Sequence, residues 1–127
     1  MPFSSRHAEP ILVVDDDPDI RALIHDLLAL DGYKVYTARD GREALELMRV
    51  LDPPPSVVFL DLMMPDMDGL QFRAIQLTEQ TLAGIPVVVM SGDNRGRQKA
   101  EAMHAQRFLE KPFDLTALNE IAQAYSP

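Results

Sequence analysis

Three short runs of apolar residues constrain the fold of this chain more than any other feature. They cover residues 11–14, 57–60 and 86–90, are rich in valine, and show no alternation with polar side chains. Continuous apolar runs of this length are typical of strands that are buried on both faces of a parallel sheet. A weaker strand is predicted over residues 33–37, where two tyrosines and a lysine suit a sheet edge. Residues 107–109 are predicted to form a fifth, very short strand.

Helical patterns fill the stretches between these runs. Apolar residues at helical spacing predict a helix that begins at Pro18, is capped by Asp17 and stops at Gly32. Further helices are predicted over residues 41–51, after Gly69, over residues 95–105, and over a last stretch capped by Asp114. The alternation of strand and helix predicts an α/β fold, with helices on both faces of a doubly wound parallel sheet.

Length and charge limit the possible classes of protein. A chain of 127 residues predicts one domain. The chain has no cysteine, which excludes disulfides and thiolate chemistry. Its net charge of −8 argues against direct binding of nucleic acid, because an acidic surface repels phosphates. No apolar run approaches the ~18 residues of a membrane span, and no signal peptide is visible. A cytoplasmic location without membrane insertion is therefore expected.

Carboxylates follow two of the predicted strands. Asp15 and Asp16 come directly after the first strand, and Asp61 comes directly after the third. In open α/β sheets, ligands bind at the carboxyl ends of the strands, so these side chains converge if the two strands are neighbours. Close carboxylates repel one another, and a hard divalent cation such as Mg²⁺ relieves that repulsion. The sequence therefore predicts a metal site, whereas Asp17 only caps the following helix.

A hydroxyl and an ammonium group follow the last two strands. Ser91 comes after the fourth strand, and Lys111 comes shortly after the fifth. Beside a metal, these groups suit the binding of a phosphoryl group, which an aspartate carboxylate can accept as an aspartyl phosphate. A lone serine here is usually a helix cap and a lone lysine is usually a solvated charge. Their shared placement at strand ends favours the functional interpretation.

Four motifs in this order resemble the receiver domain of two-component response regulators. They are Ile-Leu-Val-Val-Asp-Asp-Asp-Pro-Asp-Ile-Arg from residue 11, Val-Phe-Leu-Asp-Leu-Met-Met-Pro-Asp-Met-Asp-Gly from residue 58, Met-Ser-Gly from residue 90, and Phe-Leu-Glu-Lys-Pro-Phe from residue 108. The resemblance covers about residues 9–125, which implies a single receiver domain over residues 1–127 with its core there and an N-terminal extension over residues 1–8. It implies a CheY-like, flavodoxin-like three-layer sandwich with strand order 2-1-3-4-5 and five helices.

The resemblance also implies a metal-binding and phosphoacceptor role for each matching residue. Asp61 would be the phosphoacceptor. Asp16, Asp61 and the backbone carbonyl of Met63 would bind Mg²⁺, or Mn²⁺ in its place, and Asp15 would help to organise the ion. Lys111 would contact the phosphoryl group, and its peptide bond to Pro112 would be cis.

The resemblance further implies a switch, with Ser91 and Phe108 as its moving residues. A sensor histidine kinase or a histidine phosphotransfer protein would donate the phosphoryl group, and a downstream protein target would bind the altered surface. The chain would then be no enzyme beyond self-catalysed phosphoryl transfer and autodephosphorylation. Phe108 also fits a plain core aromatic. The stretch from Ser91 to Lys111 is short for the family, which predicts a short or shifted fourth helix.

Three functions are alternatives to a phosphoacceptor switch. A flavodoxin-like cofactor binder would need a loop rich in glycine or hydroxyls after the first strand, where this chain has aspartates. A hydrolase with an aspartate nucleophile commonly needs a second acid two residues on, where Met63 stands. A receiver-like docking module that is not phosphorylated remains the runner-up.

Other clusters have simple interpretations. Arg95, Arg97 and Lys99 predict a solvated basic face. Core packing is the default for the methionines at 63, 64 and 67, and the histidines at 7, 25 and 104 are interpreted as surface residues. Asp93 lies two residues beyond Ser91, at a position that tunes hydrolysis of the phosphoryl group in this family.

Overall fold

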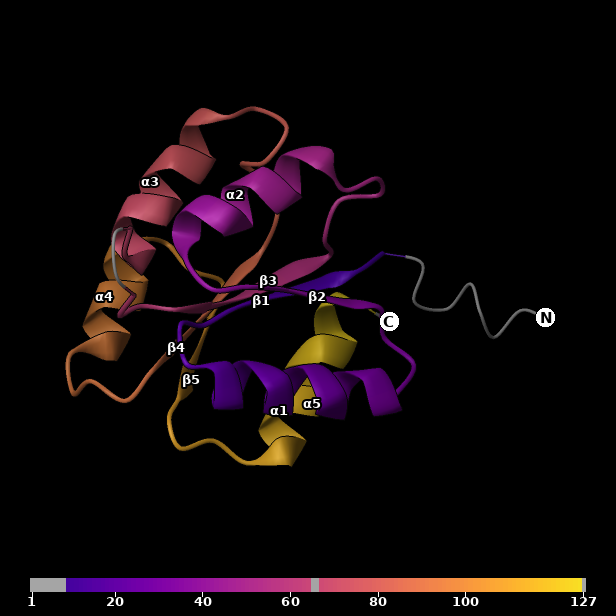
Figure 1. The fold of residues 1–127 in the computed structure, drawn as a ribbon. Coiled ribbons are helices and arrows are strands. Elements are labelled where there is room, and N and C mark those ends of the chain that lie inside the picture. Colours follow the sequence, from indigo (N-terminus) through magenta and orange to yellow (C-terminus); the bar gives the residue numbers. More distant parts are fainter. Residues whose placement is uncertain (1–8, 65–66, 127) are drawn as a thin grey trace.

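The computed structural model describes residues 9–64 and 67–126, and its centre is a five-stranded parallel sheet (Figure 1). The strand order is β2-β1-β3-β4-β5, which confirms the predicted doubly wound fold. The strands are β1 (Ile11–Val14), β2 (Val35–Ala38), β3 (Val57–Asp61), β4 (Val87–Ser91) and β5 (Arg107–Glu110).

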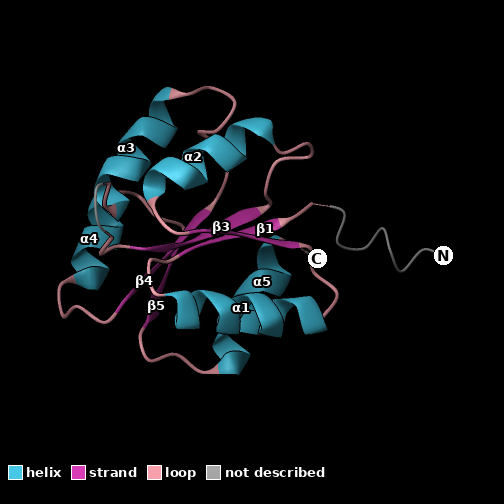
Figure 2. Cartoon of the chain, viewed as in Figure 1, coloured by secondary structure: helices cyan, strands magenta, loops and turns pink. Residues whose placement is uncertain are grey.

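Helices cover both faces of this sheet, so the molecule has three layers (Figures 1 and 2). On one face lie α1 (Pro18–Leu30) and α5 (Leu115–Tyr125). On the other face lie α2 (Gly41–Val50), α3 (Gly69–Thr78) and α4 (Gly96–Ala102). Over the described ranges, no helix combines the length and the apolar character that a membrane crossing requires.

The central strands are continuously apolar because they bury side chains in two separate cores. Leu12 and Val14 point into the core beneath α2, α3 and α4, whereas Ile11 and Val13 point into the core beneath α1 and α5. All four side chains are fully buried. Successive residues of a strand face opposite sides of the sheet, and both sides are covered here, so every residue of the strand must be apolar.

The helix boundaries follow the predicted signals in most places. The side chain of Asp17 accepts hydrogen bonds from the backbone of Asp19 and Ile20, and Pro18 occupies the first turn of α1. Gly32 has a positive φ of 88° just beyond the end of α1, a conformation that glycine adopts without strain. Asp114 caps α5 as predicted.

The fourth helix is shorter than the predicted range of residues 95–105. It begins at Gly96 and ends at Ala102, which confirms the expectation of a short helix. The chain leaves the helix through His104, whose φ is 57°, and the Ala105 N–H donates to the carbonyl of Ala100. No side chain caps the N-terminal end of α4.

Candidate functional site

The register of β1 and β3 brings the carboxylates of three aspartates together. Val14 lies opposite Leu60, so Asp15 and Asp61 follow at the same edge of the sheet. One carboxylate oxygen from each of Asp15, Asp16 and Asp61 lies within 4.8 Å of the other two. Asp15 is fully buried and Asp61 is 6% exposed, whereas Asp16 is exposed. An all-oxygen donor set of this kind fits a hard divalent cation such as Mg²⁺.

Lys111 places its ammonium group beside the two buried carboxylates. Its Nζ lies 3.0 Å from Oδ2 of Asp15 and 3.7 Å from Oδ1 of Asp61. The residue follows the end of β5, and its peptide bond to Pro112 is cis. One ammonium group offsets only part of the charge of three carboxylates, so the cluster could still hold a cation.

The electrostatic environment of Asp61 favours its protonated form. Burial raises the pKa of this carboxyl most, and the neighbouring Asp15 raises it further, to about 7. Lys111 and the backbone N–H of Met63, which donates to Oδ1 at 3.3 Å, oppose that rise. The Asp61 carboxyl is therefore easier to protonate than an exposed aspartate.

Local backbone contacts hold Asp15 in place. The Asp17 N–H donates to Oδ1 of Asp15 at 2.9 Å, and Nη1 of Arg21 donates to the Asp15 carbonyl at 2.8 Å. With Lys111 on Oδ2, both carboxylate oxygens of Asp15 have a partner. The role of Arg21 was not predicted, because the sequence does not show that a side chain of α1 turns back to the end of β1.

The methionines near Asp61 differ in their environment. Met64 is buried and Met67 packs against the core, as the default interpretation predicts. Core packing is wrong for Met63, whose side chain is 61% exposed. Its backbone follows Asp61 closely, which leaves this side chain at the rim of the acidic site.

Ser91 ends β4 and is almost completely buried. Its Oγ accepts a hydrogen bond of 3.0 Å from the backbone N–H of Asp93. On the neighbouring strand, Phe108 is half-buried and packs against the core beneath α4. The two residues that the resemblance implies as switch residues therefore lie on adjacent strands, with Phe108 opposite Val89, two residues before Ser91.

Gly96 lies against both Ser91 and Phe108, and this role of Gly96 was not predicted from the sequence. A Cβ atom at this position would lie 2.8 Å from Cβ of Ser91 and 3.0 Å from Cε1 of Phe108. Only glycine allows the first turn of α4 to approach this closely. In the sequence, Gly96 falls among polar residues at the start of the helix predicted over residues 95–105, so no signal marked its contacts.

The basic residues of α4 are more engaged than a solvated face would be. Arg95 is exposed. The guanidinium of Arg97 lies 4.9 Å from the centroid of the Phe108 ring, a cation–π contact. Lys99 donates to Oδ2 of Asp93 at 3.0 Å. The solvated-face interpretation is therefore incomplete for Lys99 and for Arg97, which are partly or fully exposed but have partners.

Two of the predicted surface histidines lie within the described residues. His104 is exposed, and the half-buried ring of His25 lies 3.0 Å from the carboxylate of Asp26. His7 lies outside the described residues.

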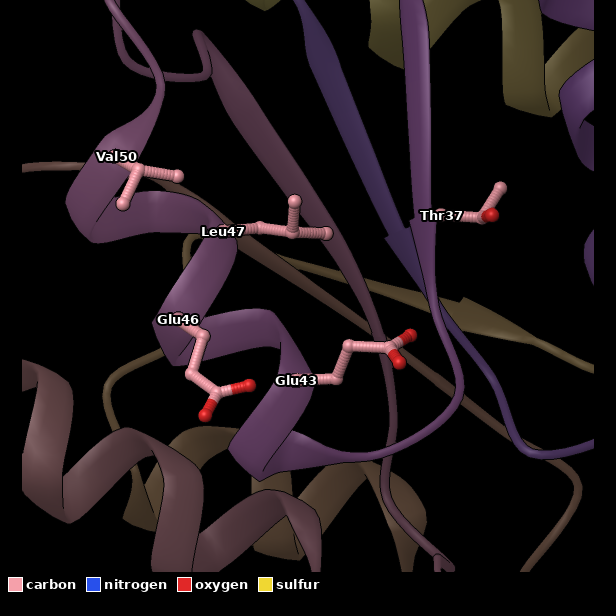
Figure 3. Close-up of a pocket in the computed structure, with 5 residues that line it drawn as sticks. All are labelled: Thr37, Glu43, Glu46, Leu47 and Val50. Carbon is pink, nitrogen blue, oxygen red and sulfur yellow. The ribbon is translucent and has the colours of Figure 1, made fainter.

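One groove lies beside the acidic cluster, and another lies apart from it. One of about 330 Å³ is lined by Ile20, Leu23, Lys111, Pro112 and Phe113 and shares Lys111 with the acidic cluster. Another of about 390 Å³ lies between β2 and α2 and is lined by Thr37, Glu43, Glu46, Leu47 and Val50. Figure 3 shows Glu43 and Leu47 extending from α2 toward the strand that carries Thr37. This second groove contains none of the clustered aspartates.

The fold and the site together define a class: a doubly wound α/β domain with an acidic cluster, a lysine and a buried hydroxyl at its strand ends. The family model of the response regulator receiver domain matches residues 11–123. The chain belongs to this family.

Curated relatives and solved structures agree with this assignment. The chain is 31% identical over 119 residues to Protein PilG of Pseudomonas aeruginosa, which covers 92% of this chain and 87% of that protein. It is 36% identical over 115 residues to Regulatory protein AtoC of Escherichia coli, covering 89% of this chain and 24% of AtoC. The structure of the chemotaxis response regulator CheY4 of Vibrio cholerae matches with a TM-score of 0.82 at 29% identity, over 92% of this chain and 98% of CheY4.

Several relatives are much longer than this chain. It is 41% identical over 105 residues to Sensor histidine kinase TmoS of Ectopseudomonas mendocina, a match that covers 81% of this chain and 10% of TmoS. The chain therefore spans only a small part of some of the two-component proteins that it matches.

Proposed function

We propose that this chain is a phosphoacceptor switch, in which Asp61 takes a phosphoryl group from a phosphohistidine of a sensor histidine kinase or a histidine phosphotransfer protein. One observation carries the proposal: the nearly buried Asp61 carboxylate lies within 4.8 Å of two further carboxylates and 3.7 Å from the ammonium of Lys111. This arrangement supplies a nucleophile, a cation site and a fixed positive charge, which are the groups that phosphoryl transfer requires.

The acidic cluster would hold Mg²⁺, or Mn²⁺ in its place. Asp16, Asp61 and the backbone carbonyl of Met63 are the proposed direct ligands, and Asp15 orients the site while paired with Lys111. When bound, the cation supplies charge neutralisation for the phosphoryl oxygens. The all-oxygen donors of the cluster fit such an ion.

The chain's own groups account for the transfer step. A carboxylate oxygen of Asp61 attacks phosphorus as the bond from phosphorus to the imidazole nitrogen breaks, and the imidazole keeps the electron pair. Lys111, already 3.7 Å from Asp61, pairs with a phosphoryl oxygen. The Ser91 hydroxyl donates a second hydrogen bond after it leaves the N–H of Asp93.

The groove that shares Lys111 with the site supports a protein as phosphodonor. Leu23 is 51% exposed at this groove, and Ile20 and Phe113 complete an apolar wall. A partner seated there would have its reactive side chain beside Lys111 and Asp61. The rearranged surface around Phe108 would then bind a downstream protein. Turnover is limited to self-catalysed phosphorylation and autodephosphorylation, so the chain is a switch and not an enzyme in the usual sense.

Intact-mass measurement after incubation with acetyl phosphate and Mg²⁺ tests this proposal. We expect the wild type to gain the mass of one phosphoryl group, and we expect no gain in Asp61→Asn or in chelator. Asp31→Asn is the matched control, because it removes an exposed carboxylate at the C-terminal end of α1, outside the acidic cluster, and should still be phosphorylated. Absence of a gain with acetyl phosphate or with a phosphorylated histidine phosphotransfer protein would favour the docking-module alternative.

A further inference from the structure

We propose that α4 works as a lever: Arg73 and Gln76 of α3 fix its C-terminal end, so that phosphorylation of Asp61 displaces only its N-terminal end. This inference rests on the proposed phosphoacceptor function and identifies the positioning residues that shape its output.

Arg73 holds the C-terminal end of α4 by direct hydrogen bonds. Its side chain is 4% exposed, Nε donates to the Met103 carbonyl at 3.0 Å, and Nη2 donates to the His104 carbonyl at 2.8 Å. Within the described residues, no carboxylate forms an ion pair with this guanidinium. Its charge is instead stabilised by carbonyls at the negative end of the α4 dipole. These bonds hold the backbone carbonyls of the two residues that follow the last residue of α4.

Gln76 fixes Arg73 to the rest of the fold. It is fully buried, and its Oε1 accepts from Nη1 of Arg73 at 2.9 Å. Its Nε2 donates to the carbonyls of Leu82 and Ile85, at 3.0 and 2.9 Å, in the segment that leads into β4. Removing any member would leave buried polar groups without partners, so the network opposes movement at this end.

The N-terminal end of α4 is bonded to the loop that follows Ser91. Asp93 in this loop accepts from the N–H groups of Arg95 and Gly96, both at 2.9 Å, and from Nζ of Lys99 at 3.0 Å. Gly96 also rests directly on Ser91 and Phe108, so this end follows the loop. Ser91 is tied to the preceding loop through the Asp93 N–H. A displacement of Ser91 or Phe108 is therefore transmitted to Gly96 by contact.

The two ends together determine how α4 can move. The helix has seven residues, which is short enough to move as one rigid body. A rigid body that is held at one end rotates about that end, so the displacement is largest at Gly96 and smallest at Met103. Figure 1 shows α4 beside α3, the helix that carries the anchor.

Amide resonances of α4 test the lever with Mg²⁺ and beryllofluoride as the probe. We expect beryllofluoride to shift the amides of Gly96 to Lys99 strongly and those of Met103 to Ala105 by no more than about a third as much. Hydrogen exchange in the unmodified protein tests the anchor by itself. In Arg73→Met, the amides of residues 103–105 should exchange about tenfold faster, while the Lys99 amide changes little. Beryllofluoride should then shift both ends of α4.

Arg49→Met is the matched control, because Arg49 pairs with Glu79 on the surface between α2 and α3 and does not contact α4. It should leave exchange at residues 103–105 unchanged. If Arg73→Met does not fold, Arg73→Lys keeps the charge, reaches fewer carbonyls, and should show an intermediate increase in exchange. Equal beryllofluoride shifts at both ends of wild-type α4, or unchanged exchange in the Arg73 variant, would overturn the lever alone. A wild type that takes neither beryllofluoride nor a phosphoryl group would refute the proposed function and the lever with it.

Discussion

Replacing the Asp61 carboxylate with an amide should stabilise the protein at neutral pH when no divalent cation is present. Burial and the neighbouring Asp15 make the ionised form of Asp61 unfavourable, and the positive charge of Lys111 compensates for this cost only in part. Asp61→Asn keeps the shape of the side chain and removes the charge. The expected gain is therefore a direct measure of the electrostatic cost of this carboxylate.

The size of the effect follows from the raised pKa. The folded state holds the proton to about pH 7, whereas the unfolded chain releases it near its ordinary value of 3.8. A group whose pKa is raised by folding lowers the free energy of unfolding as the pH rises between these two values. At about 1.4 kcal/mol for each pKa unit, the upper limit is about 4 kcal/mol. Below about pH 4 both proteins are neutral at this position and the difference vanishes.

Urea denaturation in EDTA, followed by circular dichroism at a series of pH values, measures this difference. Asp93→Asn is the matched control, because its effect has the opposite sign. The backbone N–H of Arg95, and then Lys99, lower the pKa of Asp93. This carboxylate therefore adds stability above its ordinary pKa and loses it as the pH falls. As the pH rises, the wild type should therefore become more stable relative to Asp93→Asn and less stable relative to Asp61→Asn.

Saturating Mg²⁺ should reverse the order of the Asp61 pair, because a cation bound only to the folded state stabilises it. The wild type should then be at least as stable as Asp61→Asn near neutral pH. A difference in EDTA that does not depend on pH, or a variant less stable than the wild type near pH 7.5, would refute the argument that burial and Asp15 make Asp61 costly.

Three further predictions concern stability by urea denaturation. Gly96→Ala should cost about 1–3 kcal/mol, because its Cβ would lie 2.8 Å from Cβ of Ser91; Gly84→Ala, with no atom within 4 Å, should be nearly neutral. Gln76→Leu should cost about 2 kcal/mol, because the carbonyls of Leu82 and Ile85 and the guanidinium of Arg73 each lose a buried hydrogen bond. Asp114→Ala should cost about 1 kcal/mol by removing the cap of α5, without changing Mg²⁺ affinity.

The acidic site was predictable because the backbone alone places it. Apolar runs identified the central strands, and parallel strands end at one edge of the sheet. Asp15 and Asp61 directly follow paired residues of β1 and β3, so their convergence required no knowledge of side-chain packing. The same reasoning placed Ser91 at the end of β4. The caps Asp17 and Asp114 were predictable for a similar reason, since each bonds to the backbone of its own helix.

The residues that escaped prediction make contacts between distant segments. Arg73 lies in a helix without a clean apolar stripe, and its partners Met103 and His104 are about thirty residues away. The available signal was an arginine and a glutamine three positions apart on one helix. The sequence alone did not show that this face of α3 is buried. The prediction for Met63 was wrong for the converse reason. An apolar residue that follows a core strand can still point to solvent, as Met63 does.

These two groups divide the proposed switch into an input half and an output half. The phosphoacceptor end depends on strand order and strand ends, and any sequence with this topology and these aspartates would build it. The response of α4 depends on the contact of Gly96 with Phe108 and on the anchor formed by Arg73. Those contacts are properties of individual side chains and not of the topology. Chains with the same acidic site can therefore differ in which end of α4 moves, and that difference determines the surface presented to a partner.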